Sequence, residues 1–383
     1  MVSGRNILGL LFSVNNKIYN VEWSHDAGIP SKHVDYTLVT LMTGDENGAS
    51  GVQPAINLYD DNGYLLGHRS NREGYRVDKS NDLDKHIYKI EHNAHKNKME
   101  TPKYVVVNQW SSDAICLSAL QVSNGRLSAV FYGDLGAFCG QSWYFSRRRL
   151  SDKLPHPKCV WIDEDHTAGF NARAISFHLN DMLGTPDKVM MYRENPEEYL
   201  CKSTPRFAFW KNLLPDSHVP IFRPPLQYER DEISGQEGRD KDPRLAIDKV
   251  KWDKDAKTDP QPIVRRSTAS SQRKPERAKL SKRQGTNHDV SHLVVTRAEG
   301  HEASAVCNST TSYGWDVVSL REATYCDMTV KQLYNLCDEQ YKENCFDLER
   351  KVLVGHGGIN ARGEVSSIGV PEKRYESTSH WEE

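Results

Sequence analysis

Residues 114–132 read AICLSALQVSNGRLSAVFY, and this stretch decides the fold class. Two apolar runs, residues 114–122 and 126–132, flank Ser123-Asn124-Gly125, a sequence typical of tight turns. The stretch therefore predicts a β-hairpin.

Further strand candidates lie on both sides of this hairpin. Asp61-Asn62-Gly63 indicates a second hairpin, in which an alternating run meets the turn and Tyr64-Leu65-Leu66 resumes the pattern. The remaining strand candidates are residues 36–43, 54–59, 104–107, 159–162 and 174–179. Turn signals at this spacing, with few helical patterns between them, predict a mainly β fold with an antiparallel β-sandwich or jelly-roll-like domain over residues 33–225.

Length and charge limit the possible classes of protein. The chain has 383 residues, which suggests two or three folded units. Its 50 Lys and Arg against 52 Asp and Glu give a net charge of −2, which makes nucleic acid an unexpected partner for the whole chain. No run approaches about 18 apolar residues, so we expect no membrane span. In the N-terminal segment, residues 1–32, the apolar run Ile7–Phe12 is short for a secretory signal and equally fits a first strand.

The middle of the chain, residues 226–287, changes character. Residues 253–289 contain almost no large aliphatic or aromatic side chains, and such a segment cannot offset its ordering entropy. We therefore predict a disordered basic linker. Within it, Lys282-Arg283 fits a cleavage site for a dibasic-specific processing protease. A polyanion-binding arm and plain solvated charge are the alternatives.

Folded character returns in residues 288–354, which predict a small α+β domain rich in disulfides. Residues 291–297 and 316–320 are strand candidates, and residues 328–338 place apolar side chains at helical spacing. The Gly-, Glu- and Ser-rich residues 355–383 predict a flexible tail.

The eight cysteines form two groups of four, separated by more than a hundred residues. Even counts within each group predict two disulfides per group and an oxidising, extracellular compartment; reduced cytosolic thiols are the alternative. No CxxC pair occurs, so a zinc ribbon is unsupported. Asn308-Ser309-Thr310 is a glycosylation acceptor sequence. The cysteines are Cys116, Cys139, Cys159 and Cys201, then Cys307, Cys326, Cys337 and Cys345.

The sharpest local feature is residues 161–169, WIDEDHTAG. Asp163 and Asp165 alternate before a glycine, as in short loops that wrap oxygen ligands around calcium. Asp134 could add a third acid from a neighbouring loop, although a hairpin turn with solvated acids explains the same pattern. We therefore treat these three acids as candidate ligands of Ca²⁺, the one cofactor that the sequence suggests.

Three tryptophans, Trp110, Trp143 and Trp161, lie near strand ends or loops of the predicted sandwich. Exposed indoles there would stack on sugar rings, because the face of a pyranose offers apolar C–H surface. Core packing is the commoner role of an indole. The three residues are nevertheless our candidates for binding a carbohydrate or another cell-surface ligand.

No catalytic motif stands out, and we lean towards a protein that is not an enzyme. The rival hypothesis is a secreted hydrolase or toxin-like effector with a site built from Asp134, Asp163, Asp165 and His166. Two carboxylates about 5–9.5 Å apart would favour glycosidase chemistry. Acids converging on one point would favour calcium.

Two stretches resemble a group of secreted, mostly uncharacterised proteins of filamentous fungi. The first, within residues 113–167, ends in WIDEDHT, and the second is SYGWDVVS at residues 312–319, followed by YCDM at residues 325–328. The resemblance covers about half of the chain and implies an extracellular fungal protein with disulfides, without supplying catalytic residues. The leading hypothesis is thus a secreted, non-enzymatic binding protein that recognises carbohydrate or a cell surface with the help of calcium.

Overall fold

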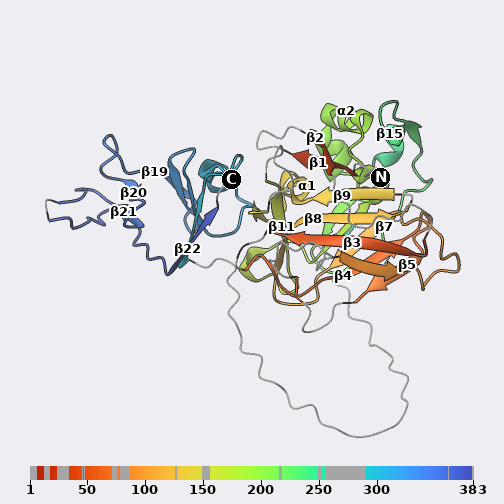
Figure 1. The fold of residues 1–383 in the computed structure, drawn as a ribbon, viewed down its shortest axis with the longest axis horizontal. Coiled ribbons are helices and arrows are strands. Elements are labelled where there is room, and N and C mark those ends of the chain that lie inside the picture. Colours follow the sequence, from red (N-terminus) through yellow and green to blue (C-terminus); the bar gives the residue numbers. More distant parts are fainter. Residues whose placement is uncertain are drawn as a thin grey trace, which may run out of the picture.

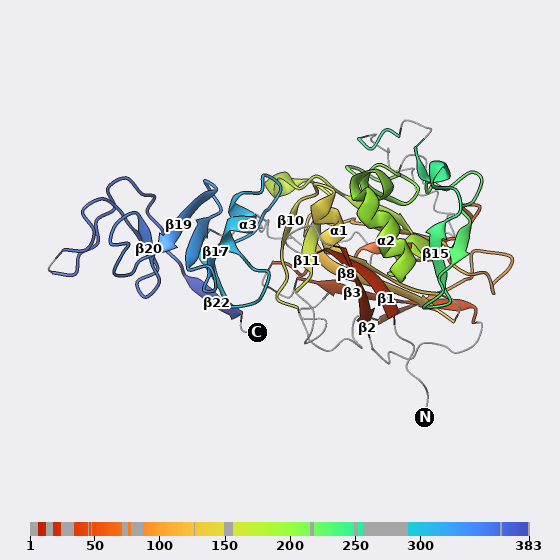
Figure 2. The same cartoon turned by 90° about the horizontal axis from the view of Figure 1, so that it is seen from above.

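The computed structural model is mainly β, as predicted, and divides into a sandwich and a smaller C-terminal unit beside it (Figures 1 and 2). No helix among the described residues is long and apolar enough to cross a membrane. The predicted cleavage site, Lys282 and Arg283, lies outside these residues. The structure describes residues 7–12 and 18–23 (backbone only), 34–70 without 45 and 47, 76–77, 87–148 without 126, 156–214, 218–248, 252–255, and 290–381 without 361.

The first sheet of the sandwich is organised around β8 (Ile115–Asn124), which is buried along all ten residues. It pairs antiparallel with β9 (Leu127–Tyr132) through the predicted hairpin, and with β3 (Tyr36–Thr43) and β11 (Lys158–Ile162). Since β8 carries neighbours on both edges, it is the central strand of this sheet. The remaining strands are β1 (Ile7–Phe12), β2 (Ile18–Trp23), β6 (Ile87–Glu91) and β10 (Trp143–Phe145).

The second sheet is antiparallel throughout, in the order β13-β12-β7-β4-β5. Its middle strand β7 reads YVVVN and is buried at every position, as expected where both faces are covered. The predicted strands and the Asp61-Asn62-Gly63 turn are all confirmed to within two or three residues. The bounds are β4 (Ala55–Tyr59), β5 (Leu65–Arg69), β7 (Tyr104–Asn108), β12 (Ala174–His178) and β13 (Phe207–Trp210).

The predicted linker begins too early, because residues 226–248 are folded. They include β14 (Tyr228–Arg230) and β15 (Glu237–Asp240), and β15 packs on α2 (Pro186–Glu194). Polar contacts hold this region: the Asp231 carboxylate accepts hydrogen bonds from the backbone N–H groups of Asp187 and Ser234. A count of apolar residues does not detect such contacts.

The C-terminal unit is a mixed sheet with the short helix α3 (Ala303–Cys307) beside it. Two parallel pairs, β16 with β17 and β16 with β22, form one side of the sheet. The strand order is β21 (Val352–Val354), β20 (Cys345–Asp347), β19 (Gln332–Leu336), β18 (Thr324–Asp327), β17 (Asp316–Ser319), β16 (His292–Thr296) and β22 (Ser377–Trp381).

Two predictions for this unit are wrong. Residues 328–338 form a turn and the strand β19 instead of a helix, because Lys331 takes a left-handed backbone (φ 55°) and β19 pairs with β18. Residues 355–383 are not a free tail, because β22 pairs with β16 and its last residue, Trp381, is buried.

All eight cysteines form disulfides, and every pair stays within its predicted group. The bonds join Cys116 to Cys159, Cys139 to Cys201, Cys307 to Cys326, and Cys337 to Cys345. None of them connects the sandwich to the C-terminal unit.

An aromatic junction joins the two units through residues of β10 and β11 on one side and the SYGW segment on the other. Trp143 exchanges backbone hydrogen bonds with Thr311 and Tyr313, at 3.0 and 2.8 Å. The Tyr144 hydroxyl donates to the Trp315 carbonyl at 2.6 Å. Gly314 lies so close to Tyr144 that a Cβ atom would fall 2.2 Å from its ring. The SYGW glycine is therefore required by close packing.

Candidate functional site: an acid pair beside an exposed tryptophan

The acid loop, residues 163–169, follows β11 and has an unusual backbone. His166 and Ala168 adopt left-handed conformations, with φ of 56° and 61°, which non-glycine residues rarely do, and Gly169 follows at 81°. The flanking aromatic residues hold the loop: Trp161 stacks on Phe170 with ring centroids 4.8 Å apart. Such local strain persists only where the surroundings enforce it.

Asp163 is the buried member of the acid pair. Its exposed fraction is 0 %, its Oδ2 accepts a hydrogen bond from the Thr167 hydroxyl at 3.2 Å, and its Oδ1 receives none. Asp165 interacts with it side chain to side chain and also accepts a hydrogen bond from the Thr167 N–H. Burial and the neighbouring Asp165 raise the pKa of Asp163 to about 7. Hydrogen bonds from Thr167 help to lower the pKa of Asp165.

Two neighbouring carboxylates, one of them fully buried, disfavour each other's ionised form unless a positive charge compensates them. Either a proton bridges Asp163 and Asp165, or a cation does. The orphan Oδ1 of Asp163 is the atom that such a cation would contact. Among the described residues, no three His, Cys, Asp or Glu side chains are grouped as metal ligands. A bound cation would therefore need further oxygens from backbone, the Thr167 hydroxyl or water.

Asp134 does not join this pair. It lies in α1 (Gly133–Phe138), and its Oδ2 accepts a hydrogen bond from the N–H of Lys158, at the start of β11. Asp163 follows the other end of that strand, about 16 Å away at the usual rise per residue. Burial raises the pKa of Asp134 to about 7 as well. The expectation that Asp134 joins Asp163 and Asp165 in one site is therefore wrong.

Trp110 is the predicted tryptophan that lies on the surface, 43 % exposed. The Arg173 guanidinium covers one face at 5.1 Å and pairs with Glu164 of the acid loop at 2.7 Å. A hydrogen bond from the Glu164 N–H to the Ser111 carbonyl, at 3.4 Å, joins the two loops directly. Trp110 and the acid loop thus form one surface, which we call the Trp110 surface.

Trp143 and Trp161 are buried, so the prediction that they form an exposed platform is wrong. Trp161 donates its indole N–H to the Tyr313 carbonyl at 2.8 Å, and Trp143 donates to the Ser309 hydroxyl at 3.1 Å. Both therefore anchor the C-terminal unit. Asn308, the predicted glycosylation site, is exposed next to this contact.

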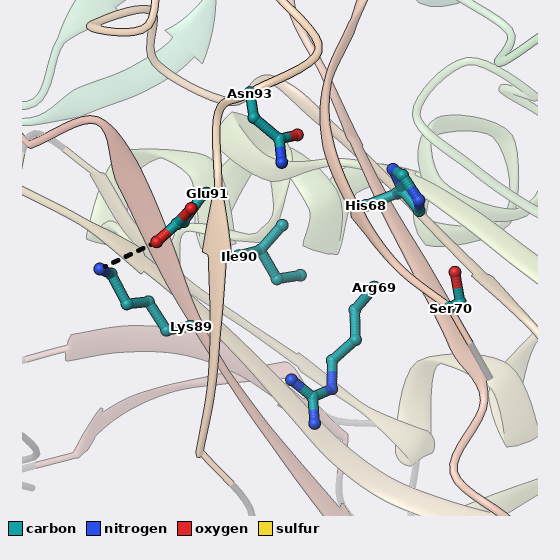
Figure 3. A pocket seen from close by; sticks show the side chains of 7 residues that line it. All are labelled: His68, Arg69, Ser70, Lys89, Ile90, Glu91 and Asn93. Carbon is teal, nitrogen blue, oxygen red and sulfur yellow. Dashed lines mark hydrogen bonds and ion pairs between the residues drawn. The ribbon is translucent and has the colours of Figure 1, made fainter. Parts of the chain in front are cut away.

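A pocket of about 310 Å³ opens between the edge strands β5 and β6 (Figure 3). This pocket is not predictable from the sequence, because its two walls belong to different sheets. Lys89 pairs with Glu91 at 3.4 Å, and Arg69 lies over the Tyr88 ring at 4.6 Å. Charged side chains on edge strands also prevent pairing with other chains, and we assign them that role. The lining residues are His68, Arg69, Ser70, Lys89, Ile90, Glu91 and Asn93.

A buried charge cluster below the second sheet also escaped the sequence analysis. Asp181 receives the Arg206 guanidinium at 3.2 Å, the Lys188 ammonium at 3.5 Å and the His178 ring at 2.9 Å. Arg206 and Lys188 outweigh burial and hold the pKa of Asp181 well below its usual range. Arg206 pairs in turn with Asp240 of β15. Because Asp181, Lys188 and Arg206 are all fully buried, this cluster ties β15 to the sandwich and has no access to a ligand.

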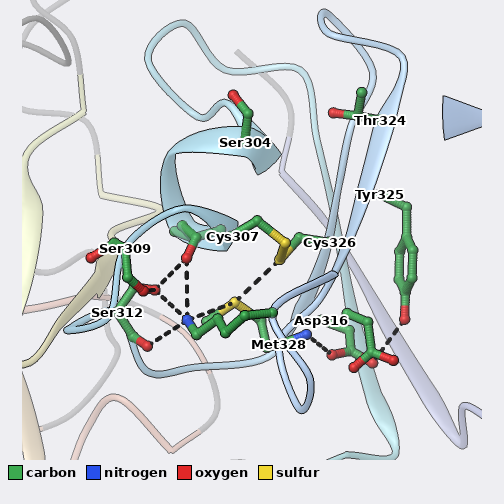
Figure 4. Close-up of a disulfide and its surroundings, with 12 residues drawn as sticks. Ser304, Cys307, Ser309, Ser312, Asp316, Thr324, Tyr325, Cys326 and Met328 are labelled. Atoms are coloured by element: carbon green, nitrogen blue, oxygen red, sulfur yellow. Dashed lines mark hydrogen bonds between the residues drawn. A yellow bond between two sulfur atoms is a disulfide. The ribbon is translucent and has the colours of Figure 1, made fainter. Parts of the chain in front are cut away.

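Ser312 lies near the Cys307–Cys326 disulfide (Figure 4) and is paired with Lys331. Burial lowers the pKa of Lys331 to about 8, and its ammonium contacts the Ser312 hydroxyl and the Ser312 carbonyl. Ser312 is itself buried and donates its hydroxyl to the Val306 carbonyl. A nucleophile must be reachable, so we interpret this pair as a structural cap of α3.

Comparisons with known proteins found no significant similarity. No family model matches the chain, and neither a curated protein nor a solved structure shows significant similarity. The functional conclusion therefore depends on the geometry alone.

Proposed function

We propose that this chain is an extracellular, non-enzymatic binding protein that uses the Trp110 surface to bind carbohydrate or a glycosylated cell surface, with calcium held by Asp163 and Asp165. The observation that carries the proposal is the orphan Oδ1 of Asp163, which is buried next to a second carboxylate. A calcium ion would satisfy that atom, neutralise the pair and fix the loop beside Trp110. The four disulfides agree with an oxidising compartment.

The rival hydrolase finds less support. Glycosidases separate their two carboxyl groups by about 5 Å or more, to leave room for a sugar and for water. Asp163 and Asp165 are instead close enough for the Asp165 carboxylate to help raise the pKa of Asp163. The His166 ring donates Nδ1–H to the Phe170 carbonyl at 2.9 Å, which leaves Nε2 as the basic nitrogen, and Nε2 is buried without a hydrogen-bond partner among the described residues. Because Nε2 is shielded from solvent, it is not placed to take a proton from water or a substrate.

Calcium binding can be tested by thermal unfolding with added Ca²⁺ or EDTA. Calcium at a hundredfold excess over its Kd should stabilise the protein by about 2.7 kcal/mol. Asp163→Asn should abolish the shift, because it removes one of the two charges. Asp134→Asn is the matched control, since Asp134 is an equally buried acid outside the site, and it should leave the shift intact. A wild-type melting curve that does not change when calcium is added would contradict the proposed metal site.

Ligand binding can be tested on an array of immobilised glycans, with and without EDTA. Trp110→Ala should remove binding, whereas Tyr64→Ala should not, although Tyr64 is another exposed aromatic residue. Equal binding by wild type and Trp110→Ala would place the ligand elsewhere. Release of reducing sugar from bound glycans would favour the hydrolase instead.

Processing at Lys282-Arg283 remains part of this proposal. Because no disulfide connects the sandwich to the C-terminal unit, cleavage there would leave two chains held by the aromatic junction. Expression in a fungal secretory host should give two fragments on a denaturing gel that elute together from a native sizing column. A single uncut chain, unchanged by replacing Lys282 and Arg283 with alanine, would reject processing.

A further inference from the structure

One lysine of the C-terminal unit lies between two buried carboxylates. Lys373 precedes β22, and its Nζ is 2.6 Å from Asp327 Oδ1 at the end of β18 and 2.9 Å from Asp316 Oδ2 at the start of β17. Both aspartates have an exposed fraction of 0 %, and Lys373 is 8 % exposed. An amine is thus held against carboxyl groups in a site from which water is largely excluded.

The two carboxylates have different surroundings. Asp316 accepts hydrogen bonds from the Met328 N–H at 2.7 Å and from the hydroxyls of Tyr325 and Tyr375 at 3.0 and 2.7 Å (Figure 4 shows the first two donors). Asp316 therefore has three hydrogen-bond donors besides the lysine. Asp327 has the opposite character: its Oδ1 accepts from the Thr329 N–H at 2.9 Å, but its Oδ2 is buried and receives no hydrogen bond. Asp327 is therefore the carboxylate with the unpartnered oxygen, and that oxygen is the one that can leave without breaking a hydrogen bond.

The walls of the site are aromatic. Tyr325 stacks on Phe346 with centroids 4.0 Å apart, and Tyr375 lies at 6.3 Å from Phe346. In such surroundings two carboxylates and one ammonium leave a net negative charge that is costly to bury. Joining Asp327 and Lys373 as an amide removes one buried pair of opposite charges, and the remaining negative charge stays on Asp316, which keeps its three other hydrogen-bond donors.

We propose that Lys373 and Asp327 form an intramolecular amide bond. The Nζ atom attacks Cγ of Asp327, so a C–N bond forms, the C–OH bond of the carboxyl group breaks, and the oxygen leaves as water. The Nζ ammonium gives up two protons in all: Asp316 accepts each in turn, and delivers the first to the Asp327 carboxylate, which becomes the C–OH group, and the second to the departing hydroxyl. Ammonium plus carboxylate thus become amide plus water, and no oxidant or cofactor is needed.

The structure holds Nζ of Lys373 next to the carboxyl group of Asp327. This fixed contact raises the rate of a reaction that is very slow between separate molecules in solution, because well-oriented neighbours react at very high effective concentration. Burial lowers the pKa of Lys373, but the two carboxylates outweigh burial and raise it. The amine is therefore protonated at rest, and transfer of its proton to Asp316 precedes attack. We expect a slow reaction that depends on Asp316.

The proposed bond would attach the chain just before β22 to the middle of the C-terminal sheet. Residues 327 and 373 would then close a covalent loop that includes the Cys337–Cys345 disulfide. The strand that ends in the buried Trp381 would no longer be able to leave the sheet by peeling away from its N-terminal side.

Intact-mass measurement of the full, freshly reduced chain tests the proposal. We expect a mass lower than the sequence mass by one water, and a branched tryptic peptide that contains both Asp327 and Lys373. Lys373→Arg and Asp316→Asn should each restore the full mass. Asp327→Asn should form the same amide with loss of ammonia, a check that does not depend on removing a partner. Lys351→Arg, which alters another lysine close to β22, should keep the water loss.

Circular dichroism and disulfide mapping should confirm that each variant is folded, so that a restored mass cannot be due to unfolding. A wild-type chain of full mass, cleaved normally by trypsin after Lys373, would overturn the proposal. Water loss that maps to an unbranched peptide, such as a cyclised aspartate elsewhere, would overturn it equally.

Discussion

The sandwich and the C-terminal unit both bury charged side chains, but they compensate them differently. In the sandwich, two cations, Lys188 and Arg206, surround Asp181, and Arg206 pairs with the second acid, Asp240. In the C-terminal unit a single lysine serves two aspartates, with tyrosine hydroxyls supplying the remaining donors. The sandwich adds this cluster to two fully packed apolar sheets. The smaller unit has fewer apolar layers and depends more on cross-links, as small domains generally do.

The largest effect should come from breaking the sandwich's cluster. Asp181→Asn leaves Lys188 and Arg206 buried without their shared carboxylate, which typically costs about 3–5 kcal/mol. Urea unfolding followed by fluorescence would measure this loss. Glu198→Gln, which removes an exposed partner of Lys202, should change the free energy of unfolding by less than about 1 kcal/mol. Equal losses in the two variants would show that burial does not distinguish these pairs.

The second-largest effect should come from removing a disulfide of the C-terminal unit. Replacing Cys307 and Cys326 by serine opens a loop of sequence separation 19, which costs about 3 kcal/mol in the chain-entropy picture. We expect the C-terminal sheet to lose protection from hydrogen exchange while the sandwich keeps it. Uniform loss of protection across both units would instead show that they unfold as one.

A smaller effect should follow from crowding the junction between the units. Gly314→Ala places a methyl group against the Tyr144 ring, and overpacking of this kind typically costs about 1–3 kcal/mol. The near-ultraviolet circular dichroism of the junction tryptophans should weaken while both disulfide sets stay intact. Gly363→Ala is the control, because a Cβ there meets no atom within 4 Å, although its positive φ adds a modest strain. An unchanged spectrum for Gly314→Ala would contradict the close contact.

The smallest effect concerns pH. In the folded protein the pKa values of Asp163 and Asp134 are raised to about 7, so the folded state binds protons that the unfolded state has already released. Stability in EDTA should therefore fall as pH rises through 7, by about 1.4 kcal/mol per acid between pH 6 and 8. Asp163→Asn and Asp134→Asn should each remove the contribution of one acid to this dependence of stability on pH. A stability that rises over this range would contradict both assignments.

The sequence predicts what short-range patterns encode. The β8–β9 hairpin follows from two apolar runs around a turn, and disulfide grouping follows from cysteine spacing. The strand β22 was missed because its partner β16 lies far away in the chain; His292 and Ser377 are 85 residues apart. β19 was missed because a left-handed Lys331 overrides a helical spacing that the same residues also satisfy.

The candidate site was predicted in part for similar reasons. Asp163 and Asp165 are two residues apart, so their meeting needs little more than a tight loop. Trp110 was correctly placed on the surface, but the same reasoning failed for Trp143 and Trp161. The sequence alone does not show whether an indole is exposed to solvent or packs against another unit. Here residues 309–315, more than 150 positions later in the chain, accept hydrogen bonds from both indoles.

The absence of a disulfide between the units means that the peptide connection alone controls their local concentration. While the chain is intact, the C-terminal unit is covalently tethered to its docking surface, so their association is intramolecular. After a cut between residues 255 and 290, the same contacts become an ordinary bimolecular equilibrium that dilution can shift. A single proteolytic event would then convert a permanent arrangement into one whose lifetime is set by how quickly Trp143, Trp161 and Trp381 leave their partners.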